Sequence, residues 1–149
     1  MRFIRTLMSR KGKPIDFKAI EPEITALCRQ FKIDLFYIFG SYASGKPGLL
    51  SDIDIAYFSK HKINPLKLLP HLQDLFKEEA LDLVDLSTAP PALVHQVLKK
   101  GKCLYSKDLK AKIDFEMKAE CEYYDTAHLR KTFFASMLRR IENGTYGLR

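Results

Sequence analysis

Two aspartates, Asp52 and Asp54, lie two residues apart where the sequence alternates aspartate with isoleucine. Side chains two positions apart on a β-strand leave the same face, about 7 Å apart at the backbone, so Ile53 and Ile55 point to the opposite face. Neighbouring carboxylates repel each other, and a bridging divalent cation removes that repulsion. The pattern therefore indicates either a Mg²⁺ site that also takes substrate phosphates or the acidic, solvated face of an edge strand.

A glycine and a serine, Gly40 and Ser41, follow the dense apolar run Ile33–Phe39, which predicts a buried strand. Glycine lets the backbone approach a phosphate closely. The free N–H groups at the start of a helical turn attract anions, and the serine hydroxyl is a further donor. The pair alone predicts only a turn, but beside two aspartates it is a candidate phosphate-binding element.

A third carboxylate is expected from the strand predicted over Leu81–Leu86, which contains Asp82 and Asp85. These two aspartates are three positions apart, so they lie on opposite faces of the strand. Only one of them can share a face with the aspartate pair, and the residues alone leave the choice open. A carboxylate in an apolar strand is costly unless it is paired or solvated, so at least one has a specific role.

Other metal and nucleotide sites are excluded by their spacing. Residues Gly40–Lys46 read Gly-x-x-x-x-Gly-Lys, but Pro47 stands where a P-loop needs a serine or threonine hydroxyl for Mg²⁺. The three cysteines contain no Cys-x-x-Cys pair and the four histidines have no ligand spacing, so neither a zinc site nor a disulfide framework is indicated. We expect thiols in a reducing cytoplasm and histidines that are surface or half-buried residues.

The elements that would position these groups alternate between helix and strand, which predicts an α/β fold. The 149 residues, 46% of them hydrophobic, predict a single domain without a membrane span or secretory signal, and hence a cytoplasmic protein. Residues 1–13 carry five basic groups and no acid and are expected to form a flexible arm; residues 14–106 form the core, and residues 107–149 a helical extension. One long helix is expected over Asp108–Glu142, closed by Asn143 and Gly144.

The joint pattern of Gly40-Ser41, ten residues, Asp52-Ile53-Asp54 and an aspartate-bearing strand about thirty residues later resembles the signature of the DNA polymerase beta-like nucleotidyltransferases. The stretch Val84–Tyr105, the short chain and the long C-terminal helix are similar to the minimal nucleotidyltransferases. The resemblance covers roughly Ile20 to Tyr105. It implies a small mixed sheet flanked by helices, with the site on one edge of the sheet.

The resemblance also implies roles for individual residues. Asp52, Asp54 and Asp82 would be the catalytic, Mg²⁺-binding carboxylates, and Gly40 with Ser41 would hold the triphosphate of ATP. The family often has an arginine three residues after the serine. Here that position is Ser44, and Lys46 is near enough to supply the missing cation. The expected nucleotide-binding set therefore consists of Gly40, Ser41, Ser44 and Lys46.

Minimal nucleotidyltransferases are commonly encoded beside a HEPN-type RNase toxin, and some of them adenylylate a toxin tyrosine. The resemblance therefore implies Mg²⁺-dependent transfer of AMP from ATP to a partner toxin, with the chain acting as antitoxin in a hetero-oligomer. The Arg-x(4–6)-His motif of HEPN toxins is absent from this sequence. Two alternatives stay open: an antitoxin that neutralises by binding alone, and a nucleotidyltransferase for a small molecule or a nucleic acid. The basic ends suit nucleic acid, although no stripe of interleaved basic and aromatic residues supports it.

The C-terminal helix has a stripe of apolar and aromatic residues that predicts either a partner surface or packing against the chain's own sheet. The stripe consists of Met117, Cys121, Tyr124, His128, Leu129, Phe133, Phe134, Met137 and Ile141.

Overall fold

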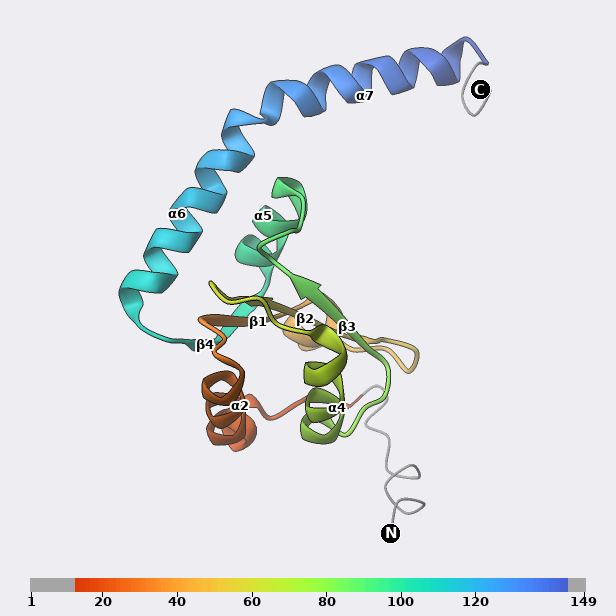
Figure 1. Cartoon of the computed structure of the whole chain (residues 1–149). Helices are drawn as coiled ribbons and strands as arrows, with labels where there is room; N and C mark the ends of the chain where they lie inside the picture. Colours follow the sequence, from red (N-terminus) through yellow and green to blue (C-terminus); the bar gives the residue numbers. More distant parts are fainter. Residues whose placement is uncertain (1–12, 145–149) are drawn as a thin grey trace.

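A mixed four-stranded sheet lies at the centre of the computed structural model, which describes residues 13–144 (Figure 1). The strands, in the spatial order β3-β2-β1-β4, are β1 (Leu35–Phe39), β2 (Ile53–Phe58), β3 (Leu81–Asp85) and β4 (Lys102–Ser106). β1 is antiparallel to both β2 and β4, whereas β2 and β3 are parallel. The expected α/β class with a small mixed sheet is thus confirmed, and residues 1–12 of the expected basic arm lie outside the described residues.

Helices cover both faces of this sheet. They are α2 (Phe17–Phe31), α3 (Gly40–Ala43), α4 (Pro65–Phe76), α5 (Pro91–Lys100), α6 (Leu109–Asp125) and α7 (Ala127–Glu142). α2 and α4 lie on one face, while α5 and α6 lie on the other (Figure 1). Within residues 13–144, no helix combines the length and apolarity needed to cross a membrane.

Local capping interactions decide where the first two long helices begin and end. The Asp16 carboxylate accepts hydrogen bonds from the N–H groups of Lys18 (3.2 Å) and Ala19 (3.4 Å), as expected for an N-cap. Lys77, with φ +52°, adopts the left-handed conformation that ends α4. α4 therefore ends at Phe76.

The alternation of side chains along the strands divides the core into two layers. Phe36 and Ile38 face the layer built with α2 and α4, whereas Leu35 and Tyr37 face the layer built with α5 and α6. All four are at most 2% exposed. Burying one such large apolar side chain contributes about 1.5–3 kcal/mol. Packing in these two layers therefore fixes the position of the C-terminal end of β1.

α6 is attached to the sheet by specific contacts. The Tyr37 hydroxyl donates to the Glu116 carboxylate (2.9 Å), and the Phe115 ring stacks on Phe58 with centroids 4.3 Å apart. Burial, then Cys103 and Glu116, raise the pKa of Tyr37, so its hydroxyl stays a donor at neutral pH. Ala119 is 6% exposed, so α6 belongs to the packed body of the molecule.

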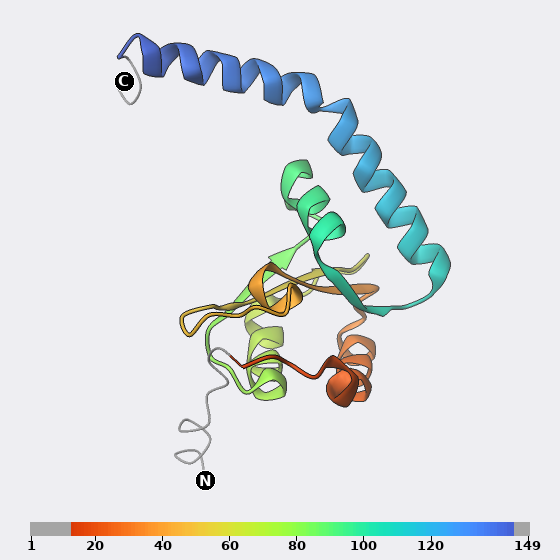
Figure 2. The same ribbon diagram turned by 180° about the vertical axis from the view of Figure 1, so that it is seen from behind.

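The helix expected over Asp108–Glu142 is divided into α6 and α7 at Thr126, which has φ −93° and ψ 3°. The Thr126 hydroxyl donates to the carbonyl oxygens of Glu122 (2.7 Å) and Tyr123 (3.2 Å). Such bonding of a threonine hydroxyl to the preceding turn bends helices. The chain changes direction here, and α7 continues away from the sheet (Figures 1 and 2).

α7 is the one helix among residues 13–144 that has no buried residue. Leu129 is 59% exposed and Phe133 is 65% exposed. The alternative that the apolar stripe packs against the chain's own sheet is therefore wrong for α7. The stripe remains open to a partner.

Candidate functional site

The site forms where β1 ends and where β2 and β3 begin. Phe39, the last residue of β1, pairs with Asp54 of β2, and Asp54 pairs with Asp82 of β3. Residues in register on parallel neighbours point to the same face, with the strands about 4.8 Å apart. Asp54 also alternates with Ala56, which packs in the α5 and α6 layer. The two carboxylates therefore lie together on the face that α5 and α6 cover only in part.

Asp52 precedes the first residue of β2 and is exposed, whereas Asp54 is half-buried. The pKa of Asp54 is raised by burial, then by the charges of Asp82 and Asp52. Each of these two carboxylates thus disfavours the ionised form of Asp54. The structure brings the three aspartates of the sequence pattern into one electrostatic cluster.

The Asp85 side chain lies on the opposite face of the sheet from Asp54. It pairs with Tyr57, whose side chain packs in the α2 and α4 layer on the opposite face of the sheet. The Asp85 carboxylate accepts hydrogen bonds from the backbone N–H (2.9 Å) and hydroxyl (2.6 Å) of Ser87. Its side chain therefore holds the turn after β3, and Asp82 is the aspartate of β3 that shares a face with Asp54.

The chemistry of this donor set suits Mg²⁺ bound together with a nucleotide. Mg²⁺ takes one or two carboxylates and fills its remaining positions with water and substrate phosphates. Within residues 13–144, no group of three His, Cys, Asp or Glu side chains is already at the spacing of metal ligands. Carboxylates that repel each other spread apart, so this site fits an ion that arrives with phosphates better than a closed site of three protein ligands.

Gly40 is required beside the cluster for two reasons. Its φ is +71°, a conformation that other residues adopt only with strain. A Cβ atom at this position would also overlap the Oδ2 atom of Asp54. The backbone at the end of β1 therefore passes directly against a carboxylate of the cluster.

The turn after Gly40 contains the other residues expected to bind the nucleotide. Ser41 is half-buried in α3, and its carbonyl oxygen accepts from the Ser44 hydroxyl (2.8 Å) and from the Lys46 N–H (3.2 Å). The Ser44 hydroxyl is thus used within the turn, and Ser44 brings no charge. Lys46 is exposed and is the residue of this turn that carries a cation.

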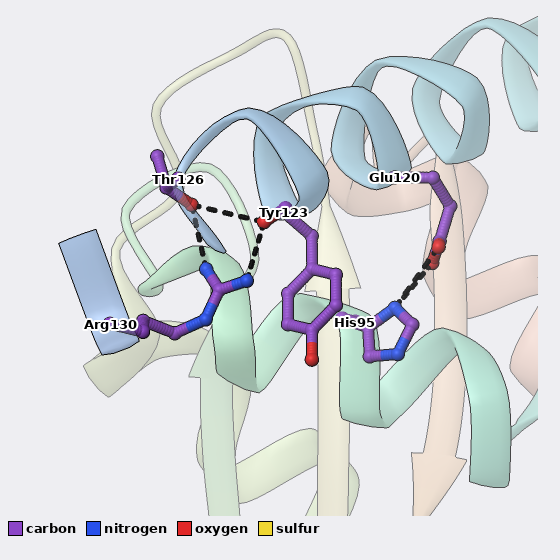
Figure 3. Close-up of polar contacts among 5 residues, drawn as sticks. All are labelled: His95, Glu120, Tyr123, Thr126 and Arg130. Carbon is purple, nitrogen blue, oxygen red and sulfur yellow. Dashed lines mark hydrogen bonds and ion pairs between the residues drawn. The ribbon is translucent and has the colours of Figure 1, made fainter. Parts of the chain in front are cut away.

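One cluster of side chains is not anticipated by the sequence. His95, expected to be a surface or half-buried residue without a special role, is half-buried between α5 and α6 (Figure 3). Its Nδ1 atom lies 2.9 Å from Glu120, and its ring stacks on Tyr123 with centroids 3.8 Å apart. These contacts join residues 25 or more positions apart, so no local spacing in the sequence indicates them.

Comparison with known proteins agrees with this geometry. The family model "Polymerase beta, Nucleotidyltransferase" matches residues 22–110. The protein adenylyltransferase MntA of Shewanella oneidensis is 37% identical over 76 residues, which cover 50% of this chain and 55% of that protein. This chain thus spans about half the length of the curated relative that it matches.

Solved structures extend the likeness over most of the chain. A chain of a crystal structure described as a toxin–antitoxin with AMP-PNP is 29% identical, with a TM-score of 0.68 over 79% of this chain and 98% of that chain. A chain from a tri-AMPylated Shewanella oneidensis HEPN toxin in complex with an MNT antitoxin is 26% identical, with a TM-score of 0.54 over 85% and 97%. Since the family model matches more than half of its residues, the chain belongs to the polymerase beta nucleotidyltransferase family.

Proposed function

We propose that this protein is an antitoxin that transfers AMP from ATP to a tyrosine hydroxyl of a partner HEPN-type toxin in a Mg²⁺-dependent reaction. One observation carries the proposal: Asp54 and Asp82 share a face beside Gly40, in a chain of the nucleotidyltransferase family. The similarity to MntA and to chains of toxin–antitoxin structures supports the choice of acceptor.

Asp52 and Asp54 would hold Mg²⁺ against the phosphates of ATP, with Asp82 completing the site. When bound, Mg²⁺ neutralises the charge of the carboxylates and the phosphates and polarises the α-phosphate. The backbone at Gly40 and the Ser41 hydroxyl hold the triphosphate, and Lys46 contributes a positive charge.

Asp82 would orient the acceptor hydroxyl and accept its proton. The hydroxyl oxygen forms a bond to the α-phosphorus while the bond from that phosphorus to the bridging oxygen of the pyrophosphate breaks. Pyrophosphate leaves, and AMP remains attached through a phosphodiester. The sheet face carrying the aspartates is only partly covered, which suits an acceptor presented by another protein.

The partner would dock on α7. Its exposed apolar side chains extend along the helix, and the large ones among them are Leu129, Phe133, Phe134, Leu138 and Ile141. An exposed apolar surface of this kind marks interaction sites. α7 continues from α6, which lies on the same side of the sheet as Asp54, so a protein held by α7 would be kept on the side where the carboxylates point.

Intact mass spectrometry of the toxin after incubation with this protein, ATP and Mg²⁺ tests the proposal. We expect the toxin to gain the mass of AMP, and we expect Asp52→Asn/Asp54→Asn to abolish the gain. Asp82→Asn should also abolish it while Asp85→Asn retains it, because only Asp82 shares the face of Asp54. The reverse result would identify Asp85 as the third carboxylate.

A second experiment separates catalysis from binding. A chain that ends at Thr126 lacks α7 but keeps the packed α6, so it should fold and yet lose binding to the toxin. If the full chain inhibits the toxin by stoichiometric mixing without any mass gain, the protein neutralises by binding alone. A mass gain on RNA or on a small molecule instead of the toxin would identify a different acceptor.

A further inference from the structure

The angle between α6 and α7 is set at one residue, Thr126, which lies between the end of α6 at Asp125 and the start of α7 at Ala127. No residue of α7 is buried, so the core does not hold this helix in place. Each residue has two soft backbone dihedrals, and small changes in those of Thr126 would redirect the whole of α7. The contacts that fix this angle therefore determine where a protein held on α7 would lie.

Arg130 of α7 reaches back across this joint to α6 (Figure 3). Its guanidinium donates to the Thr126 hydroxyl (2.7 Å) and to the Tyr123 carbonyl oxygen (2.5 Å), and its Cζ atom lies 4.0 Å from the centroid of the Tyr123 ring. That carbonyl belongs to the last turn of α6, where backbone acceptors lack a partner within the helix. Because the guanidinium is planar, these three contacts define both its position and its tilt.

Tyr123 is held in turn by a residue of α5. The His95 ring stacks on the Tyr123 ring, with centroids 3.8 Å apart and planes within 4° of parallel. The His95 Nδ1 atom also lies 2.9 Å from a carboxylate oxygen of Glu120 on α6. Figure 3 shows Tyr123 between the imidazole of α5 and the guanidinium of α7. His95, Glu120, Tyr123, Thr126 and Arg130 together form the joint cluster.

The joint cluster is connected to the catalytic edge of the sheet through α5. Val97 of α5 is 0% exposed and packs in the same layer as Tyr37 and Ala56 of the sheet.

The end of α5 also lies directly against the end of β1. A Cβ atom on Gly101, the residue after α5, would be 2.9 Å from the Ile38 carbonyl oxygen and 3.3 Å from Phe39 Cβ. Phe39 is the strand partner of Asp54. A continuous set of contacts thus connects Asp54 with the residues that set the direction of α7.

We propose that Arg130 is a positioning residue that fixes the angle between α6 and α7, so that a toxin bound on α7 presents its hydroxyl oxygen in line with the α-phosphorus of ATP. The inference rests on the proposed function. α7 has 16 residues and is therefore about 24 Å long. A rotation of about 10° at Thr126 moves the far end of a helix of this length by about 4 Å. A misplacement of about 1 Å already costs about a hundredfold in rate.

A simpler role for Arg130 would be to cap the C-terminal end of α6. Cations stabilise that end of a helix, and a lysine would do so as well as an arginine. The guanidinium makes two hydrogen bonds and a ring contact at once, and the compact ammonium group of a lysine cannot reproduce this geometry. Capping contributes to stability but not to the placement of the toxin, so the two roles predict different results for AMP transfer.

AMP transfer is measured in single turnovers at saturating concentrations of this protein, ATP and Mg²⁺, and toxin binding is titrated separately. Arg130→Ala should lower the rate at saturation by about ten- to a hundredfold and leave the affinity for the toxin unchanged, because the apolar side chains of α7 remain. Arg130→Lys should lower the rate as well. Arg139→Ala, the same change in the last turn of α7, is the matched control.

Three outcomes overturn the proposal. Arg130→Ala could transfer AMP as fast as the Arg139→Ala control. Full activity in Arg130→Lys would leave only the capping role. A loss of affinity with an unchanged rate at saturation would identify Arg130 as a direct contact with the toxin.

The angle itself is measured in the free protein with spin labels on the exposed Cys121 of α6 and on Leu138→Cys of α7. Alanine is the best helix former, so Arg130→Ala should keep α7 helical while the distance distribution between the labels broadens or shifts. A distribution equal to that of the Arg139→Ala control overturns the proposal.

A short peptide that contains the target tyrosine of the toxin provides an acceptor that does not depend on α7. We expect Arg130→Ala and the unmodified protein to attach AMP to this peptide at equal rates. A loss of peptide transfer in Arg130→Ala would place Arg130 at the catalytic site and overturn the proposal. A toxin that gains no AMP from the unmodified protein contradicts the proposed function, while the distance measurement still shows whether Arg130 fixes the angle.

Discussion

The sheet edge that carries the aspartates and the helix α7 are built in opposite ways. At the sheet edge, buried strands hold charged groups against one another, and the pKa of Asp54 is raised by burial and by the neighbouring charges of Asp82 and Asp52. In α7, apolar side chains lie in solvent and none is buried. Each region carries an arrangement that is unfavourable in the isolated chain. Under the proposed function, a cation with phosphates would relieve the first arrangement, whereas another protein would cover the second.

The largest effect is expected from Asp54→Asn, which removes a carboxylate from the site. AMP transfer should fall about a thousandfold, since a metal site supplies several kcal/mol of transition-state stabilisation. Transfer to the toxin measured by mass spectrometry gives the rate. Asp125→Asn, the same change at an exposed position of α6, should keep the activity. Equal rates for the two variants would remove Asp54 from the site.

The stability of the same variant, Asp54→Asn, should depend on pH. The pKa of Asp54 is higher in the folded chain than in the unfolded chain, so the folded state holds its proton more tightly. Stability therefore falls as the pH rises from the unfolded value, about 3.9, through the raised folded value, and the full cost remains at neutral pH. Without Mg²⁺, Asp54→Asn should raise the Tm at neutral pH, and the gain should shrink as the pH is lowered through this window. A gain in Tm that increases as the pH is lowered would contradict a raised pKa of Asp54 in the folded chain.

A matched pair of leucines tests the contrast in packing. Leu72 of α4 is 0% exposed and Leu129 of α7 is 59% exposed. Leu72→Ala should lower the free energy of unfolding by about 2–5 kcal/mol, whereas Leu129→Ala should change it by less than about 0.5 kcal/mol. Urea denaturation of each variant provides the values. Only Leu129→Ala should weaken binding to the toxin without affecting the fold, and a large loss of stability in Leu129→Ala would mean that α7 packs on the core.

Gly40→Ala should damage the site more than the fold. The new Cβ displaces the Asp54 carboxylate, and a misplacement of about 1 Å costs about a hundredfold in rate. The positive φ adds strain of about 1–3 kcal/mol to the folded state. Gly45→Ala has a similar φ, +74°, but no atom within 4 Å of its Cβ, so it isolates the effect of strain. Equal activity in the two variants would show that contact with Asp54 is unimportant.

The smallest expected effect concerns the starts of two helices. The Asp16 side chain caps α2, so Asp16→Ala should lower the free energy of unfolding by about 1 kcal/mol. No side chain caps the start of α7, where Thr126 instead shapes the joint with α6. Thr126→Ala should leave global unfolding unchanged and alter hydrogen exchange only in the residues around the joint. A stability loss as large as that of Asp16→Ala would indicate that the joint belongs to the core.

Much of the core is predictable because its signals are local. The spacing of apolar residues and the cap at Asp16 account for the bounds of α2. The alternation of aspartate with isoleucine identifies β2, which begins at Ile53. Gly40-Ser41 and the aspartates at the start of β2, Asp52 and Asp54, are close in sequence and joined by a short loop, so their proximity follows from the chain itself. The break at Thr126 is not predictable in this way, because the periodicity of α6 and α7 is continuous through it.

The order of amino acids identifies which groups are available for chemistry and which strands contain them. The choice between Asp82 and Asp85 as the neighbour of Asp54 follows from the fold, because it depends on the register between β2 and β3. The structure alone also stacked His95 on Tyr123 and left the apolar stripe of α7 in solvent. Each of these outcomes depends on contacts between residues distant in sequence, and spacing along a chain reports only on neighbours within a few residues.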